Sequence, residues 1–123
     1  MSDLGTAHWP TEIRLKRAER QLEIDFDDGT TFRLPAEYLR VESPSAEVQG
    51  HGPHQRQLVP GKARVGIKSV EAVGNYAIRL VFDDGHDTGI YSWAYLRQLG
   101  AERETRWRNY LAALQAAGMS REK

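Results

Sequence analysis

One order of elements occurs twice in this sequence, and this repeat constrains the fold more than any other feature. In each copy an alternating apolar and polar segment leads into Asp-Asp-Gly, a second strand-like segment follows, and a Tyr-Leu-Arg helix comes next. The copies span residues 22–40 and 76–97. Period-two alternation with one polar face is typical of antiparallel strands, and Asp-Gly favours the positive φ values of a tight hairpin turn. The sequence therefore predicts a fold built from two related halves.

Further alternating segments precede the two copies, at residues 13–15 and 67–73. We therefore expect an α+β fold with two antiparallel β-meanders, each followed by a short helix. At 123 residues the chain has the size of one domain with its own core. We assign that domain to residues 11–118, between a flexible arm at 1–10 and a C-terminal tail at 119–123.

A C-terminal amphipathic helix is predicted from about Glu102 to Ala117. Its aromatic and leucine side chains fall at the i, i+3, i+4 and i+7 positions of one stripe, and Gly118 is the stop signal. These side chains are Trp107, Tyr110, Leu111 and Leu114. Because an apolar helix face needs a surface to cover it, we expect this helix to pack on the sheet.

The stretch at residues 41–64 shows no periodicity. It begins with Ser43-Pro44-Ser45 and carries two of the histidines, His51 and His54. An irregular segment of this length is unusual in a compact domain and is often either functional or mobile. We therefore expect a contact with a partner here.

Composition excludes several classes of function. The chain has no cysteine, which removes disulfides, thiolate catalysis and cysteine-ligated zinc or iron–sulfur clusters. Lysine plus arginine equals aspartate plus glutamate at 17 each, so no net charge draws the chain to nucleic acid or to an anionic membrane. No apolar run approaches the roughly 18 residues of a membrane span, and no signal-peptide pattern begins the chain. A cytoplasmic protein is expected.

His86, which directly precedes Asp87, is the histidine with the strongest functional interpretation. These two residues form a candidate metal-binding set with His51 and His54, because imidazole and carboxylate groups ligate metal ions. The structural alternative is that His86 packs against a turn or caps it, and that the loop histidines face solvent. The sequence contains neither a nucleophile elbow nor a phosphate-binding Gly-rich loop.

Several motifs are similar to those of one known family. They are Phe82-Asp83-Asp84-Gly85-His86-Asp87-Thr88-Gly89-Ile90-Tyr91, Ser92-Trp93-x-Tyr95-Leu96, Leu39-Arg40-Val41-x-Ser43-Pro44-Ser45-Ala46-Glu47-Val48 and Val65-Gly66-Ile67. Through these motifs the chain resembles the DUF971 family, the gamma-butyrobetaine hydroxylase-like N-terminal domain, in its stand-alone form. In carnitine-pathway hydroxylases this domain precedes a 2-oxoglutarate/iron dioxygenase domain. The domain also occurs attached to iron–sulfur carrier ATPases.

The family domain holds a structural zinc through three cysteines and a histidine, and the resemblance places these ligands on Ser43, Ser45, Val48 and His86. Serine hydroxyls are poor zinc ligands at neutral pH and valine is none, so the inherited site is expected to be degenerate and empty, and no cofactor is expected. Dioxygenase activity is not expected either, because the chain has no His-x-Asp/Glu pair of an iron site.

These observations together favour a small non-enzymatic binding module, which docks a protein partner through residues 41–64 and the His86 turn. The resemblance suggests iron–sulfur or iron-dependent enzymes as the class of partner. Two alternatives stay open: a metal-binding protein that uses His51, His54, His86 and Asp87, and a dimerisation module whose last helix pairs between copies. Neither nucleic acid nor a membrane is an expected partner.

Overall fold

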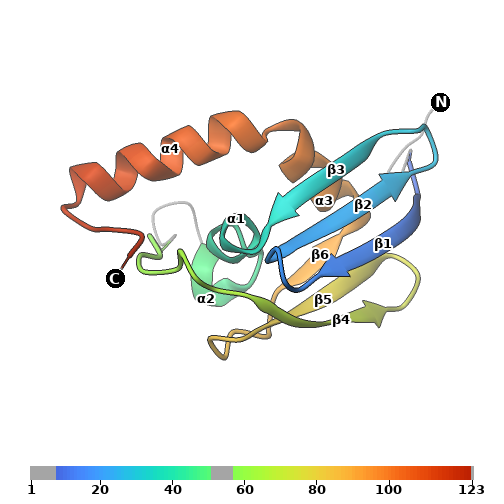
Figure 1. The fold of residues 1–123 in the computed structure, drawn as a ribbon, viewed down its shortest axis with the longest axis horizontal. Coiled ribbons are helices and arrows are strands. Elements are labelled where there is room, and N and C mark those ends of the chain that lie inside the picture. Colours follow the sequence, from blue (N-terminus) through green and yellow to red (C-terminus); the bar gives the residue numbers. More distant parts are fainter. Residues whose placement is uncertain (1–7, 51–56, 123) are drawn as a thin grey trace.

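A computed structural model describes residues 8–50 and 57–122. These ranges contain two antiparallel sheets and four helices (Figure 1). The strands are β1 (Pro10–Lys16), β2 (Gln21–Phe26), β3 (Thr31–Pro35), β4 (Ile67–Val73), β5 (Ala77–Phe82) and β6 (Ile90–Ser92). The helices are α1 (Ala36–Val41), α2 (Ala46–Gln49), α3 (Trp93–Ala101) and α4 (Arg103–Ala116). The predicted α+β fold, with its two meanders and its C-terminal helix, is therefore confirmed.

Each meander is a three-stranded sheet, in the order β1-β2-β3 and β4-β5-β6. The central strands carry the deepest side chains, and Leu22, Ile24 and Leu80 are fully buried. The alternation in the sequence places these residues on one face of each sheet. One hydrophobic core joins both sheets to α1 and α3.

The two hairpin turns adopt the backbone conformation that the sequence predicts. Gly29 and Gly85 end the Asp-Asp-Gly turns with φ values of 87° and 95°. A residue with a Cβ atom adopts such values only at a cost in energy, which explains why glycine stands at both positions.

A tyrosine of each half donates a hydrogen bond to a carbonyl oxygen of the other half. Tyr38 of α1 donates its hydroxyl to the carbonyl oxygen of Leu99 in α3, at 2.6 Å. Tyr95 of α3 donates to the carbonyl oxygen of Glu42, which follows α1, at 2.5 Å. Each tyrosine therefore satisfies a carbonyl near the end of the other half's helix, where no intrahelical partner exists.

Each half also supplies an arginine to the turn of the other half. Arg97 of α3 donates to both carboxylate oxygens of Asp28, at 3.1 and 2.6 Å. Arg40 of α1 donates through Nε to Asp84 at 2.8 Å, and Lys62 Nζ lies 2.6 Å from the same oxygen. Hydrogen bonds from Arg97 hold the pKa of Asp28 well below its usual range. These crossed pairs fix the position of each helix on the opposite turn.

The prediction that the last helix packs on the sheet is wrong. Tyr110 and Leu114 of α4 are buried, but Leu111 is exposed. Their neighbours are Val41, Leu58, Val59 and Trp107 rather than the strands of a sheet. The reason is that Leu96 and Leu99 of α3 already fill the core beside the strands, so α4 lies over α1 instead (Figure 1). In the described part of the chain no helix is long and apolar enough to cross a membrane.

Candidate functional site

The positions at which the family resemblance places zinc ligands lie close together. Ser43 follows α1, Ser45 is the N-cap of α2, and Val48 is buried on α2. His86 lies in the connection between β5 and β6, 43 residues further along, and its Nε2 atom is 2.8 Å from Ser43 Oγ. The relative exposure of Ser43 is 0% and that of His86 is 5%. The fold therefore assembles this site without the cysteines.

A chain of hydrogen bonds runs through the imidazole ring of His86. Its Nδ1 atom is 2.9 Å from the carboxylate oxygen Oε1 of Glu47. An ionised carboxylate can accept a hydrogen bond but cannot donate one. The neutral ring of His86 therefore carries its proton on Nδ1, and its Nε2 atom accepts a hydrogen bond from the Ser43 hydroxyl. Ser43 Oγ also accepts from the backbone N–H of Ser45, at 3.2 Å. This arrangement satisfies both nitrogen atoms of the ring.

The surroundings of His86 favour its neutral form. Burial lowers the pKa of His86, and the positive charge of Arg40 lowers it further. Glu47 opposes this shift through its hydrogen bond and its charge, but the net direction remains downward. His86 therefore accepts a proton less readily than a histidine in solvent.

The order serine, histidine, carboxylate is that of a hydrolase triad, but the accessibility is reversed. A nucleophilic serine must reach a substrate carbonyl, and its carboxylate is usually buried. Here Ser43 is fully buried, and the Glu47 side chain is 62% exposed. A Cβ atom built on Gly89 would lie only 2.6 Å from Ser43 Oγ, which shows how tightly the backbone encloses the hydroxyl. The cluster of Ser43, Glu47 and His86 therefore lacks the accessible hydroxyl that such a triad requires.

Two more hydrogen bonds close the same region. Ser45 Oγ lies 2.6 Å from Thr88 Oγ1, and it accepts from the backbone N–H of Glu47 at 3.2 Å. Since this hydroxyl both caps α2 and pairs with Thr88, it ties α2 to the connection before β6. Side-chain hydrogen bonds thus join the elements at which the family resemblance places zinc ligands.

The candidate metal set of the sequence is only partly described. His51 and His54 lie outside the described residues. The carboxylate of Asp87 is directed toward Arg79, with 3.6 Å between Oδ2 and Nη1, and the Asp87 carbonyl accepts from the same atom at 2.7 Å. Within the described ranges, Asp87 is paired with Arg79 rather than with His86.

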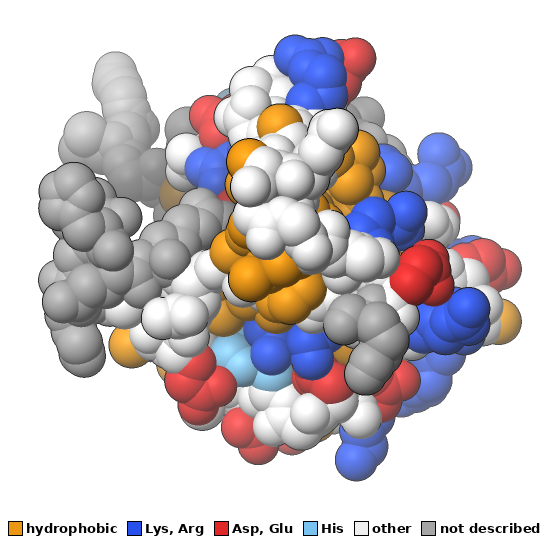
Figure 2. Space-filling model, turned by 90° about the vertical axis from the view of Figure 1, so that its left-hand side faces the viewer, with side chains coloured by type: hydrophobic (Ala, Val, Ile, Leu, Met, Phe, Trp, Pro, Cys, Tyr) orange, Lys and Arg blue, Asp and Glu red, His pale blue; other side chains and the backbone are white. Residues whose placement is uncertain are grey.

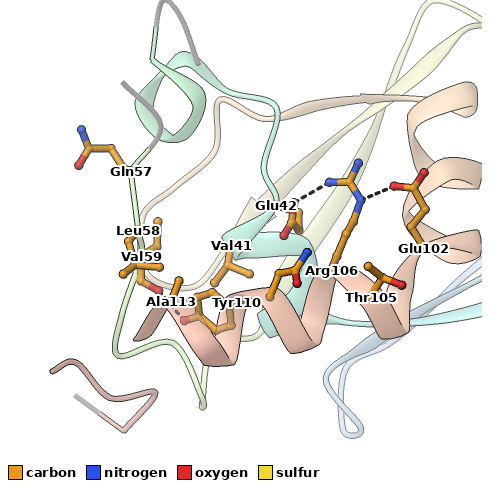
Figure 3. Close-up of a pocket in the computed structure, with 11 residues that line it drawn as sticks. Val41, Glu42, Gln57, Leu58, Val59, Glu102, Thr105, Arg106, Tyr110 and Ala113 are labelled. Carbon is orange, nitrogen blue, oxygen red and sulfur yellow. Dashed lines mark hydrogen bonds and ion pairs between the residues drawn. The ribbon is translucent and has the colours of Figure 1, made fainter. Parts of the chain in front are cut away.

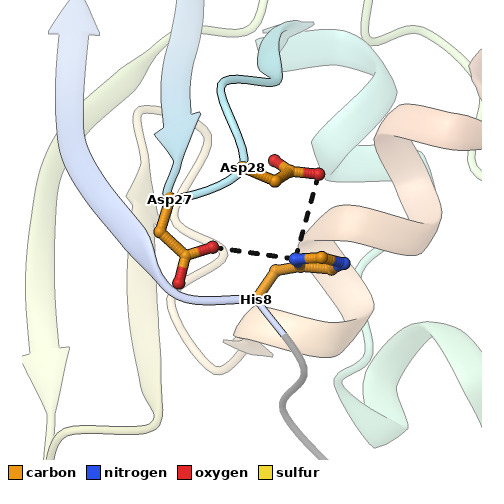
Figure 4. A group of neighbouring side chains, drawn as sticks. All are labelled: His8, Asp27 and Asp28. Atoms are coloured by element: carbon orange, nitrogen blue, oxygen red, sulfur yellow. Dashed lines mark ion pairs between the residues drawn. The ribbon is translucent and has the colours of Figure 1, made fainter.

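Sequence reasoning missed a second grouping of possible ligands. His8 Nδ1 lies 3.6 Å from Asp27 Oδ1 and 3.8 Å from Asp28 Oδ2, at the turn between β2 and β3 (Figure 4). All three side chains are solvent-accessible, and Arg97 already neutralises the Asp28 carboxylate. Asp28 also accepts the backbone N–H of Thr30 at 3.1 Å, as turn chemistry requires. The sequence analysis assigned these aspartates to a turn only, so it did not predict that their carboxylates lie close to His8.

A groove of about 520 Å³ lies between α4 and residues 57–59 (Figure 3). Its apolar side chains are Val41, Leu58, Val59, Tyr110 and Ala113. Arg106 donates to Glu42 at 2.8 Å and to Glu102 at 2.8 Å. Arg106 therefore joins two carboxylates on the polar side of the groove.

The end of the molecule where α4 finishes presents a mixed surface. Figure 2 shows hydrophobic side chains gathered in the centre of this face, with histidine, basic and acidic side chains directly beneath them.

Helix α1 links the groove to the cluster of Ser43, Glu47 and His86. Its Arg40 contacts Asp84 near the cluster, while its Val41 lines the groove.

Comparisons with known proteins identify similar sequences and folds. The family model described as "Gamma-butyrobetaine hydroxylase-like, N-terminal" matches residues 13–97. Two proteins solved by NMR are 46% and 52% identical, with TM-scores of 0.81 and 0.83; the matches cover 94% and 98% of this chain, and 90% of each of those chains. A crystal structure from Acidithiobacillus ferrooxidans ATCC 23270, of unknown function and from the DUF971 family, is 47% identical with a TM-score of 0.64, covering 76% of this chain and 93% of that chain. A search of curated proteins gives no match.

Proposed function

The chain belongs to the family of gamma-butyrobetaine hydroxylase-like N-terminal domains, and from this premise we propose that it is a non-enzymatic module that binds a protein partner. The binding surface in this proposal is the groove between α4 and residues 57–59, together with the adjoining face around His86. The family is one of unknown function, so the argument rests on the site itself.

One observation carries the proposal. The positions of the family zinc ligands are occupied by a hydrogen-bonded cluster in which Ser43 is fully buried and both ring nitrogens of His86 are paired. Such a cluster stabilises the surrounding elements but offers no accessible nucleophile. A domain with this arrangement supplies a rigid surface rather than a reaction centre.

The chemistry of the groove indicates what kind of segment it accepts. Its floor is apolar, and its polar side contains Glu42 and Glu102 against Arg106. Apolar surface drives association, while charge complementarity selects the partner. We therefore propose a partner segment whose apolar side chains cover the floor of this groove. A specific interface buries about 800 Å² on each partner, so we place the face around His86 in the same contact.

The family resemblance suggests the class of partner. Related domains are attached to iron–sulfur carrier ATPases or precede iron-dependent hydroxylases, so we propose that the partner comes from iron–sulfur assembly or is an iron-dependent enzyme. This step rests on association within the family, because fold alone does not define function.

The experiment is a quantitative pulldown with three baits of full length: wild type, Ala113→Arg and Ala112→Arg. Ala113 lines the groove, whereas Ala112 is exposed on α4 and does not line it. We expect one partner to be retained by wild type and Ala112→Arg, and its yield to fall at least tenfold for Ala113→Arg. Equal retention by all three baits would place the contact elsewhere, and retention of no protein above the bead control would contradict a binding role.

A further inference from the structure

The last described residues of the chain insert an arginine into a pocket. Arg121 donates from Nε and Nη2 to the two carboxylate oxygens of Glu37, at 2.8 and 2.7 Å. Two parallel hydrogen bonds from one guanidinium to one carboxylate are among the strongest polar contacts in proteins. The Glu37 side chain is only 9% exposed, so this carboxylate needs a cation in place.

An aromatic side chain forms the second wall of this pocket. The guanidinium carbon of Arg121 lies 5.4 Å from the ring centroid of Trp107. Trp107 is itself held edge-on against Tyr38, with 6.4 Å between the ring centroids. A ring face attracts a cation, so Trp107 and Glu37 recognise the same group from two directions. A cavity of about 650 Å³ continues from Arg121 along Trp107 toward Arg103.

The walls of the pocket belong to helices, whereas the segment that fills it does not. Glu37 belongs to α1 and Trp107 to α4. Residues 118–122, in contrast, belong to no helix or strand. In the described part of the chain, Gly61 and Ala63 donate backbone hydrogen bonds to Ser120 and Arg121, at 2.9 and 3.1 Å, and Gly118 and Met119 donate back to the last turn of α4. The Arg121 side chain remains 41% exposed.

We propose that Glu37 and Trp107 form a guanidinium-binding pocket, which Arg121 fills within the chain and which an arginine side chain of a protein partner fills when residues 118–122 leave. Arginine is the favoured occupant because its planar fork matches the carboxylate, whereas lysine offers a point charge. The pocket lies on the other side of α4 from the groove proposed above, because Trp107 and Arg108 line one and Tyr110 and Ala113 line the other. The two proposals therefore fail independently.

The test empties the pocket in the full chain. The variant Arg121→Ala keeps Glu37 and Trp107, and the probe is a synthetic peptide with the sequence Ala117 to Lys123. An NMR titration follows the indole N–H of Trp107. We expect saturable binding to Arg121→Ala, and binding at least about tenfold weaker to wild type, because a tethered arginine competes at a high effective concentration.

Two controls separate pocket recognition from general attraction between charges. Arg108→Ala removes a cation that lines the same cavity but is paired with Glu104 instead of Glu37, and it should bind the peptide no better than wild type. A peptide with Arg121→Gln should not bind Arg121→Ala. The proposal is overturned if Arg121→Ala shows no saturable shift, or if the glutamine peptide binds it equally well.

Discussion

The two halves of the molecule share one framework, but only the second half has a long connection after its Asp-Asp-Gly turn. In the first half, β3 begins at Thr31, two residues after Gly29. In the second half, residues 86–89 separate Gly85 from β6. This longer connection brings His86 to Ser43. The repeated hairpins and crossed contacts hold the fold in both halves, while the longer connection in the second half supplies His86 and Thr88 to the candidate site.

The crossed ion pairs also differ between the halves. Asp28 and Arg97 are partly exposed, with 31% and 27% of each side chain accessible. Asp84 and Arg40 are 17% and 12% accessible, and Arg40 Nη1 is a buried nitrogen without a hydrogen-bond partner in the described part of the chain. The second pair lies closer to the candidate site and is the more sensitive to loss of its carboxylate.

The largest expected effect comes from Asp84→Asn. The substitution leaves Arg40 and Lys62 without their shared negative charge, and we expect a loss of about 2 kcal/mol in the free energy of unfolding, below the upper range for fully buried pairs. The matched variant Asp28→Asn should lose less, because solvent reaches Arg97. Urea unfolding of both variants measures this difference. Equal losses would show that the two turns are energetically equivalent.

A smaller difference in the free energy of unfolding is expected between variants of the two crossed tyrosines, Tyr38 and Tyr95. Tyr38→Phe leaves the carbonyl of Leu99 without its donor in the core, which should cost about 1–2 kcal/mol. Tyr95→Phe should cost less, because the bond from Tyr95 to Glu42 is only partly buried and water can replace the donor. Thermal unfolding of the two variants ranks them. A larger loss for Tyr95→Phe would contradict this account of the packing.

The smallest effect is the contribution of His86, in the second half, to the dependence of stability on pH between pH 7.5 and pH 5. The folded pKa of His86 lies below the value of about 6.5 in an unfolded chain, so the unfolded chain binds a proton first as the pH falls. Stability present above pH 6.5 is therefore lost as the pH falls through the folded pKa. Urea midpoints at pH 7.5 and pH 5 should differ more in wild type than in His86→Gln. The same difference in both proteins would remove His86 as the cause.

Local patterns in the sequence predicted the framework. Alternation identified the meanders, and Asp-Gly identified turns at Gly29 and Gly85, because both signals depend on neighbouring residues alone. The position of α4 was not predictable in this way. Its apolar residues show that it packs against some surface. Which surface this is depends on α3, which fills the space beside the strands.

The candidate site was predictable in part. The family resemblance pointed to Ser43 and His86, but the role of Glu47 was missed because α2 is only four residues long and has no readable period. The contact from Arg121 to Glu37 was missed as well, since it joins residues 84 positions apart. Such pairs depend on tertiary packing, which a single sequence does not display.

A long-range ¹H–¹⁵N spectrum of the His86 ring tests whether hydrogen bonds, rather than a metal ion, hold the Ser43, Glu47 and His86 cluster. It is recorded at neutral pH before and after one equivalent of zinc. We predict a ring protonated at Nδ1 and unprotonated at Nε2, with no change on addition of zinc. Stoichiometric displacement of the His86 nitrogen signals by zinc, absent in control spectra of His86→Gln, would contradict the account and reopen a metal-dependent function.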